Sequence, residues 1–233
     1  MKPKTWFESA NVAIDGVIYS VRTQRHMRYH LYAALVALIL SLVLNISRSD
    51  FTLLCMAIVL VLVTEMLNTA IETTVDMISQ EFHPKAKLAK DIAAGVVLVA
   101  SVGALTLAYL ILYPALKAAI LSRQWHLTKA PSDVIAFVSL VAVIILVIII
   151  KAFVGKGVPL RGGMPSGHAA VSFSIWIAAL YLSDSLAIII LTFLLAVMVS
   201  WSRWSSGIHR PVEVVAGALL GAGVSFLFFL IFS

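Results

Sequence analysis

Two short polar stretches near the C-terminal end of the chain hold the residue types that phosphoryl transfer requires. That reaction needs a nucleophile, an acid for the leaving oxygen, and fixed positive charge around the phosphate oxygens. The first stretch covers 156–168 and the second covers 202–213. The candidate residues in the two stretches are Lys156, Arg161, Ser166, Gly167, His168, Arg203, His209 and Glu213.

Each of these residue types has a physical reason to serve at a phosphate site. The three basic residues can clamp phosphate, and arginine suits bidentate contact. Residues 166–168 open an apolar run, where free backbone N–H groups and the helix dipole favour an anion. Pro211 suits the first turn of a helix, which puts His209 just before that helix. Glu213, four residues further on, can orient His209 and stabilise its cationic form.

A second polar group lies inside an apolar run of the N-terminal half. Its members are Glu65, Asn68, Glu72 and Asp76. Offsets of 3, 7 and 11 residues from Glu65 fall within about 80° of each other on a helix, so all four share one face. If the span begins at 52, Glu65 lies about 20 Å inside it, where an ionisable group is costly and indicates function. Lys90 and Asp91 open the next run, and this set suits Mg²⁺ with nucleotide phosphates.

The elements that must position these groups are membrane helices. The chain is 61% hydrophobic and only 12% charged, and runs of about 20 apolar residues cross a bilayer. Residues 6–24 read as an amphipathic helix on the membrane surface. The apolar runs that follow cover 30–46, 52–79, 91–115, 134–153, 167–183, 186–202 and 211–232. We therefore expect an all-α integral membrane protein with an N-terminal surface helix and seven transmembrane helices.

The positive charges predict how these helices are oriented. The face with the N-terminus and the loops near 80–90, 154–166 and 203–210 carries 13 of the 17 lysines and arginines. Because cytoplasmic loops are enriched in such residues, this face is predicted to be cytoplasmic, and it holds both polar sites. The net charge of +6 then reflects topology and an anionic lipid surface, and we expect no nucleic-acid partner.

The C-terminal stretches resemble the type 2 phosphatidic acid phosphatase superfamily. Pro165, Ser166, Gly167 and His168 match its P-S-G-H motif, and S-R-x5-H-x3-D is matched with Glu213 in the place of Asp. Lys156 and Arg161 correspond loosely to K-x6-R-P. The resemblance implies that His209 is the nucleophile, His168 the general acid, and the phosphatase needs no cofactor. The residues it implies for phosphate binding are Lys156, Arg161, Ser166, Gly167 and Arg203.

The run E-x-x-N-T-A-I-E-x-x-x-D, followed by H-P-K-A-K-L-A-K-D, resembles the prokaryotic diacylglycerol kinases, and within them the undecaprenol kinase branch. The resemblance implies ATP and Mg²⁺ as cofactors, a homotrimer, and a bacterial inner-membrane location. It makes Glu65 the catalytic base and Glu72 a metal ligand. Gln24 stands where the family has a second metal-binding Glu. The nucleotide site would comprise Asn68, Asp76, Lys90 and Asp91.

The two resemblances divide the chain into a three-span kinase-like unit (1–115), an interfacial linker (116–133) and a four-span phosphatase-like unit (134–233). The leading hypothesis is a lipid-phosphate phosphatase fused to a lipid kinase for diacylglycerol or undecaprenol. One alternative is a phosphatase whose kinase-like unit is a degenerate trimerising scaffold. An alternative of another class is a proton- or ion-coupled transporter, since intramembrane carboxylates also mark ion pathways. The sequence lacks the inverted repeats typical of transporters.

Overall fold

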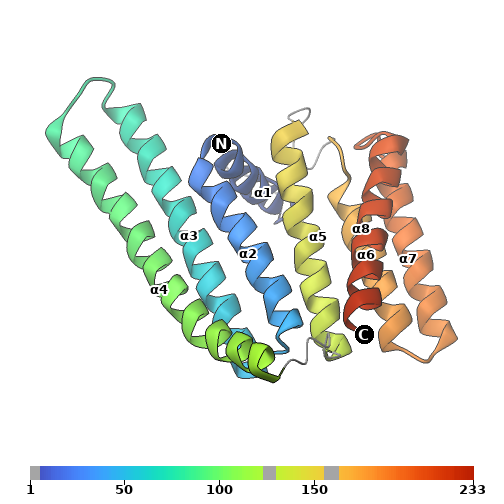
Figure 1. Cartoon of the computed structure of the whole chain (residues 1–233). Coiled ribbons are helices and arrows are strands. Elements are labelled where there is room, and N and C mark those ends of the chain that lie inside the picture. Colours follow the sequence, from blue (N-terminus) through green and yellow to red (C-terminus); the bar gives the residue numbers. More distant parts are fainter. Residues whose placement is uncertain (1–5, 123–129, 155–162) are drawn as a thin grey trace. The chain divides into compact units, whose positions relative to one another are not determined.

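A computed structural model describes residues 6–122, 130–154 and 163–233 of the chain. Within these ranges it consists of eight α-helices and no strands (Figure 1). The helices are α1 Trp6–Thr23, α2 Arg25–Val43, α3 Arg48–Ile78, α4 Pro84–Ser122, α5 Ser132–Val154, α6 Gly167–Leu182, α7 Leu186–Ser205 and α8 Pro211–Phe232. The all-helical expectation is confirmed. Lys156 and Arg161 lie outside the described residues, so their predicted phosphate contacts stay predictions.

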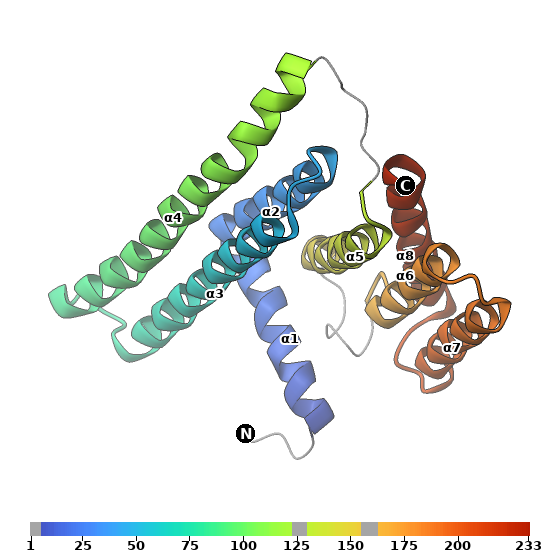
Figure 2. The same ribbon diagram turned by 90° about the horizontal axis from the view of Figure 1, so that it is seen from below.

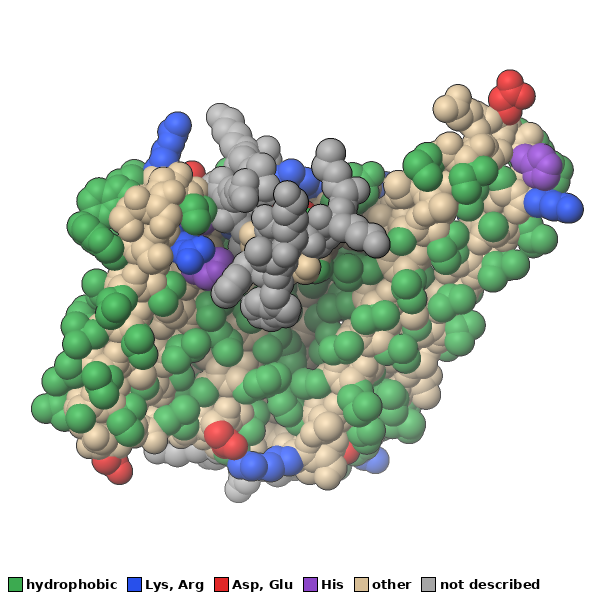
Figure 3. All heavy atoms as spheres, turned by 180° about the vertical axis from the view of Figure 1, so that it is seen from behind, with side chains coloured by type: hydrophobic (Ala, Val, Ile, Leu, Met, Phe, Trp, Pro, Cys, Tyr) green, Lys and Arg blue, Asp and Glu red, His purple; other side chains and the backbone are tan. Residues whose placement is uncertain are grey.

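Six of these helices are long and apolar enough to cross a membrane: α2, α3, α4, α5, α7 and α8. The remaining apolar run, 167–183, forms α6, which has 16 residues and is about 24 Å long at 1.5 Å per residue. That length falls short of a hydrocarbon core of about 30 Å. Figure 3 shows hydrophobic side chains over the flanks of the helices and charged side chains gathered toward their ends, as expected for helices surrounded by lipid.

Helix α4 differs from its prediction. It contains 39 residues, or about 58 Å of helix, and it runs through 116–122, which we expected to be linker. The residues there include Leu116, Ala118 and Leu121, which are strong helix formers. Pro114 lies inside the helix, and membrane helices tolerate proline because neighbouring groups re-satisfy the freed carbonyl. The apolar pattern therefore located the span, and helix propensity extended it.

The helices group into two compact units. One contains Thr23–His126, with α2, α3 and α4, and the other combines Met1–Arg22 with Leu127–Ser233. In the first unit α3 packs along α4 and also contacts α2. In the second, α6 lies at the centre and contacts α5, α7 and α8, an arrangement that Figure 2 shows end-on. Helix α1 groups with this second unit.

Helices α6 and α8 approach each other so closely that only glycine fits at two points of contact. A Cβ on Gly217 would lie 2.3 Å from the Ser166 carbonyl oxygen, and one on Gly221 would lie 1.9 Å from that of Ala170. Further along, the buried Ser174 and Ser225 hydroxyls are hydrogen-bonded at 2.7 Å. The close approach fixes the start of α6 against the first turns of α8.

Candidate functional site

The chain reverses between α7 and α8 in a way that places His209 at the start of α8. Gly207 has a φ of +66°, the left-handed conformation that commonly ends a helix and that glycine adopts without strain. Its N–H donates to the Trp204 carbonyl at 2.9 Å. Pro211 then begins α8, and the His209 N–H donates to the Arg203 carbonyl at 3.1 Å. Arg203 and His209 are thereby held at neighbouring helix ends.

The imidazole of His209 is fixed by Glu213. Its Nδ1 lies 2.8 Å from Glu213 Oε2, and the same oxygen accepts the Arg210 N–H at 3.3 Å. The Gly163 N–H also donates to the Glu213 carboxylate. His209 is 4% exposed, and its Nε2 has no hydrogen-bond partner among the described residues. Nδ1 of the ring is therefore held in place by Glu213, and Nε2 keeps a lone pair or a proton with which it can react.

The start of α6 is joined to α8 at this point. The Ser166 N–H donates to the Glu213 carbonyl at 2.8 Å. Ser166 is fully buried, and its Oγ has no hydrogen-bond partner within the described ranges. Two residues later His168 lies within electrostatic reach of Arg203, His209 and Lys151. The structure thus brings together every predicted member of the C-terminal site that it describes: Ser166, Gly167, His168, Arg203, His209 and Glu213.

Lys151 also belongs to this cluster, although its sequence position gave no such indication. It is 6% exposed near the end of α5, and it interacts electrostatically with Glu213 and with Asp15 of α1. The Arg22 side chain donates to the Lys151 carbonyl at 3.1 Å. In the sequence Lys151 looks like a topology-determining charge at the end of a span. The available signal was its place within a long apolar run, where charge is costly.

The surroundings of His209 set its charge. Burial lowers the pKa of His209 below its ordinary value, and the positive charges of Lys151 and Arg203 act in the same direction. The hydrogen bond to Glu213 opposes them without overcoming them. His209 is consequently neutral at neutral pH. A neutral imidazole held by a carboxylate on one nitrogen is the state in which the other nitrogen can act as a nucleophile.

The N-terminal polar group becomes more exposed from the middle of α3 toward its end. Glu65 is 2% exposed and Asn68 is 8% exposed, Glu72 is half-buried, and Asp76 is exposed. The Glu72 carboxylate accepts two amide N–H groups, from Gln24 to Oε2 at 3.0 Å and from Asn68 to Oε1 at 3.0 Å. The expected metal-binding pair, Gln24 and Glu72, therefore lies in direct contact.

The four predicted nucleotide residues lie in three places. Asp76 and Lys90 join the end of α3 to the start of α4 by an ion pair of 2.5 Å. Both line a polar cavity of about 330 Å³ with His83 and Lys87. Asp91 instead pairs with Lys87 at 2.6 Å on the surface of α4. Asn68 lies two turns deeper than Asp76, beside Glu72.

The oxygen atoms around Glu72 form a donor set that suits Mg²⁺. The described residues contain no cluster of three or more His, Cys, Asp or Glu side chains suited to a metal. Mg²⁺, however, is commonly bound by one or two carboxylates plus substrate phosphates and water. Glu72 supplies one carboxylate, and the buried Asn68 Oδ1 has no hydrogen-bond partner in the described part of the chain. Amide rotation would turn Gln24 Oε1 inward as well, so these residues fit an oxygen-coordinated cation.

An all-helical membrane protein with two separate polar clusters is the class that the fold and the site define, and both halves of the chain resemble known families. Residues 11–112 match the family described as prokaryotic diacylglycerol kinase, and residues 150–233 match the PAP2 superfamily. The chain is 32% identical over 123 residues to a diacylglycerol kinase of Synechocystis, covering 50% of this chain and 70% of that protein. It is 38% identical over 111 residues to an undecaprenol kinase of Bacillus subtilis, covering 48% and 90%.

The C-terminal half has a relative of its own. It is 44% identical over 63 residues to an undecaprenyl-diphosphatase of Sulfolobus acidocaldarius, covering 27% of this chain and 30% of that protein. No solved structure matches the chain significantly. The chain belongs to the prokaryotic diacylglycerol kinase family through its N-terminal half, and its residues 150–233 are similar to the PAP2 superfamily.

Proposed function

We propose that the C-terminal unit is a membrane phosphatase for lipid phosphates or lipid pyrophosphates that acts through a phospho-histidine at His209. The observation that carries this proposal is the state of the His209 ring. Its Nδ1 is held by Glu213 at 2.8 Å, while its buried Nε2 has no partner within the described residues. The PAP2 match over these residues supports the same reaction class.

In the first step His209 Nε2 attacks the terminal phosphorus and forms a P–N bond as the P–O bond to the lipid breaks. His168 donates a proton to the leaving oxygen, and Glu213 stabilises the cationic ring of His209. Arg203, together with the ammonium of Lys151, offsets the charge on the equatorial oxygens. Water then attacks phosphorus, His168 accepts its proton, and the P–N bond breaks to release inorganic phosphate.

This route uses only groups of the chain itself, so phosphate release should proceed in EDTA. His209→Ala should lose turnover, and Arg210→Ala, which alters an exposed neighbour whose side chain has no assigned role, should retain it. Both variants need a folding check by circular dichroism and gel filtration in detergent. Retained activity in His209→Ala, or strict dependence of the wild-type protein on a divalent metal, would overturn the phospho-histidine mechanism.

We further propose that the N-terminal unit transfers phosphate from ATP to a membrane lipid alcohol. The supporting observation is that Gln24, Asn68 and Glu72 meet at one point, one turn beyond the buried Glu65. Glu65 would accept the proton of the lipid hydroxyl, and Lys90 with Asp76 would border the nucleotide. Mg²⁺ held by Glu72 and the two amide oxygens would neutralise charge on the ATP phosphates.

The two units then need different substrates if they face the same side of the membrane. If both acted on one monophosphate, the pair would consume ATP without net change. We therefore propose an alcohol as the kinase substrate and a lipid pyrophosphate as the phosphatase substrate. This arrangement includes α1 on the membrane surface, α6 as a short seventh span, both sites on the cytoplasmic face, and a homotrimer built through the kinase-like unit.

Kinase activity is tested by radiolabel transfer from Mg-ATP to diacylglycerol and to undecaprenol, which should be lost in Glu65→Ala. If the wild-type protein transfers no label to either lipid, the kinase proposal is wrong, and the unit is the degenerate scaffold. The experiment separates the two alternatives because Gln24 supplies only a neutral amide, which is a weaker Mg²⁺ ligand than a carboxylate.

A further inference from the structure

A buried serine on α7, Ser200, takes no part in the mechanism proposed above. It is 8% exposed, and its Oγ is shielded from solvent and has no hydrogen-bond partner among the described residues. Within the same ranges, Ser166 Oγ, Arg203 Nε and His209 Nε2 are also shielded and without a partner. These three atoms belong to the phosphatase-like site. Because a buried polar group without a partner costs free energy, the Ser200 hydroxyl suits a further polar atom of the ligand that this site binds.

The helix that carries Ser200 does not satisfy its hydroxyl. Serine and threonine side chains in a membrane helix can donate to a carbonyl of the preceding turn, and several in this chain do so. Thr192 Oγ1, also on α7, donates to the Ile188 carbonyl at 2.8 Å. Ser172 Oγ on α6 donates to the His168 carbonyl at 2.8 Å. Ser200 makes no such bond in the described structure, so its hydroxyl is available to a bound molecule.

Ser200 lies on the same side of α7 as Arg203. Three residues separate the two, which is about 60° around the helix and about 4.5 Å along its axis. Arg203 lies in the last turn of α7, and the buried residues of this helix are Ala196 and Ser200. Because α7 packs along α6 (Figure 1), this buried side of α7 forms a seam with α6. Ser200 therefore lies in the seam, about one turn farther from the end of α7 than Arg203.

Aromatic side chains occupy the seam farther inside the membrane-spanning part. Phe173 and Trp176 of α6 contact Phe193 of α7, with ring centroids 6.3 Å and 4.9 Å from that of Phe193. Phe193 lies ten residues before Arg203, or about 15 Å along the helix. From the end of α7 inward, the seam thus offers a positive charge, then the hydroxyl of Ser200, then aromatic rings. This order suits an amphiphile with its charged head at the helix ends and its chain in the hydrocarbon.

A lipid pyrophosphate would place its two phosphates in a fixed order along this path. The terminal phosphate is the one attacked, so it lies beside His209 and Arg203. The second phosphate is bonded to the lipid chain, so it lies on the membrane side of the terminal phosphate, which is the side of Ser200. A lipid monophosphate has only its ester oxygen and hydrocarbon there. Since hydrogen bonds to charged acceptors are about twice as strong as those to neutral ones, a hydroxyl at this level distinguishes the two substrates.

We propose that the Ser200 hydroxyl donates a hydrogen bond to the second, lipid-linked phosphate of a lipid pyrophosphate and makes the site prefer it to the monophosphate of the same lipid. The proposal rests on the proposed phosphatase function and adds a specificity-determining residue to it. As the bond from the terminal phosphorus to the bridging oxygen breaks, the second phosphate leaves as the lipid monophosphate, with the proton from His168. Ser200 then contacts the group on which negative charge develops.

The test compares a polyprenyl pyrophosphate with the monophosphate of the same chain, using full-length protein in detergent with EDTA. Ser200→Ala should lower kcat/KM about 10- to 100-fold for the pyrophosphate and change it by less than about twofold for the monophosphate. Ser200→Thr keeps the hydroxyl and should keep the preference for the pyrophosphate. The matched control is Ser139→Ala, which should change neither rate. Ser139 is fully buried, donates to the Ala136 carbonyl at 3.0 Å, and lies about 18 Å along α5 from Lys151.

Binding is measured separately from turnover by isothermal titration calorimetry. The probes are a nonhydrolysable methylene-bisphosphonate of the same lipid and the corresponding monophosphonate. Ser200→Ala should weaken binding of the bisphosphonate about tenfold or more and leave binding of the monophosphonate unchanged. Circular dichroism and gel filtration establish that each variant is folded.

Equal losses on the two substrates, a larger loss on the monophosphate, or no loss on either would overturn the role of Ser200. So would equal binding of the bisphosphonate by wild type and by Ser200→Ala. The phosphatase proposal fails separately. If the wild-type protein releases phosphate from neither lipid, the proposed reaction is wrong, and bisphosphonate binding that depends on Ser200 would still support the assigned contact.

Discussion

Gly217→Ala should damage the phosphatase-like site without touching any of its chemical groups. Gly217 lies one turn beyond Glu213 on α8, and it faces Ser166, the second residue of the P-S-G-H motif at the start of α6. A methyl group at Gly217 would lie 2.3 Å from the Ser166 carbonyl oxygen and 3.1 Å from the Ser166 carbonyl carbon. Both are backbone atoms, so no side-chain rotation relieves the contact, and the two helices must separate.

The size of the effect follows from that distance. An ordinary contact begins near 3.4 Å, so the start of α6 must retreat by about 1.1 Å. The retreat also stretches the 2.8 Å hydrogen bond from the Ser166 N–H to the Glu213 carbonyl. Since His168 follows two residues later, it moves away from His209. A misplacement of about 1 Å can cost about 10²-fold in rate, which corresponds to about 2.7 kcal/mol of transition-state stabilisation.

The assay is phosphate release from a lipid pyrophosphate in detergent micelles with EDTA, reported as kcat/KM. Gly223→Ala is the matched control, because it makes the same change on the same helix where no atom lies within 4 Å. It gains the same helix propensity, up to about 1 kcal/mol, and should keep full activity. If folded Gly217→Ala retains activity within about threefold of wild type, the contact between α6 and α8 does not position the site.

Three further outcomes are expected. Because burial lowers the pKa of His209, the acid limb of kcat/KM, where protonation removes the nucleophilic lone pair, should lie below about pH 6.5. Lys151→Met removes a charge that lowers the pKa of His209, so it should move the acid limb to higher pH. Glu213→Gln removes a group that raises this pKa, so it should move the limb to lower pH. Unchanged pH profiles of kcat/KM, measured with one substrate, would contradict the contacts assigned to His209. Gln24→Glu should lower the Mg²⁺ concentration that gives half the maximal kinase rate by about tenfold, as measured by radiolabel transfer. If this concentration rises instead, Glu72 does not hold the metal. Asp15→Asn should release Lys151 and so raise the KM of the phosphatase for lipid pyrophosphate more than it lowers kcat. Asp15→Glu, which keeps the carboxylate, should restore the KM. An equal loss of activity in both variants would indicate a structural role for Asp15.

Local spacing accounts for the parts of the site that the sequence could predict. His209 and Glu213 are four residues apart around the first turn of a helix, so their side chains meet whatever the rest of the chain does. The common face of Glu65, Asn68 and Glu72 follows in the same way from the 3.6-residue period. Such pairs need only the local helix, and apolar runs located those helices with fair accuracy.

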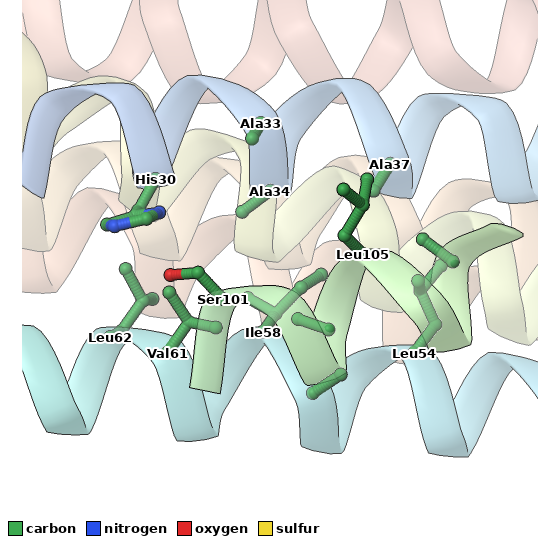
Figure 4. Close-up of a pocket in the computed structure, with 13 residues that line it drawn as sticks. His30, Ala33, Ala34, Ala37, Leu54, Ile58, Val61, Leu62, Ser101 and Leu105 are labelled. Atoms are coloured by element: carbon green, nitrogen blue, oxygen red, sulfur yellow. The ribbon is translucent and has the colours of Figure 1, made fainter. Parts of the chain in front are cut away.

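Contacts between helices could not be predicted in this way. The approach of α6 to α8 depends on glycines at 217 and 221, and these are indistinguishable in the sequence from Gly223, which touches nothing. Lys151 reaches the Glu213 cluster only because α5 packs beside α8. A groove along α2, α3 and α4 (Figure 4) is lined by alanines, among them Ala34, Ala57 and Ala104, and these look like ordinary helix formers until the three helices are placed together. Tertiary packing decides all three features, and the spacing of residues in a single sequence does not show which helices will pack together.

The central claim is that phosphate passes through a covalent bond to His209. The most direct measurement is rapid acid-free denaturation of the protein during turnover of a lipid substrate labelled with ³²P in its terminal phosphate, followed by peptide mapping. We predict label on the peptide that contains His209, stable to base and lost in acid, and absent from His209→Ala. Label on another residue, or turnover with no labelled protein at any time point, would contradict the account.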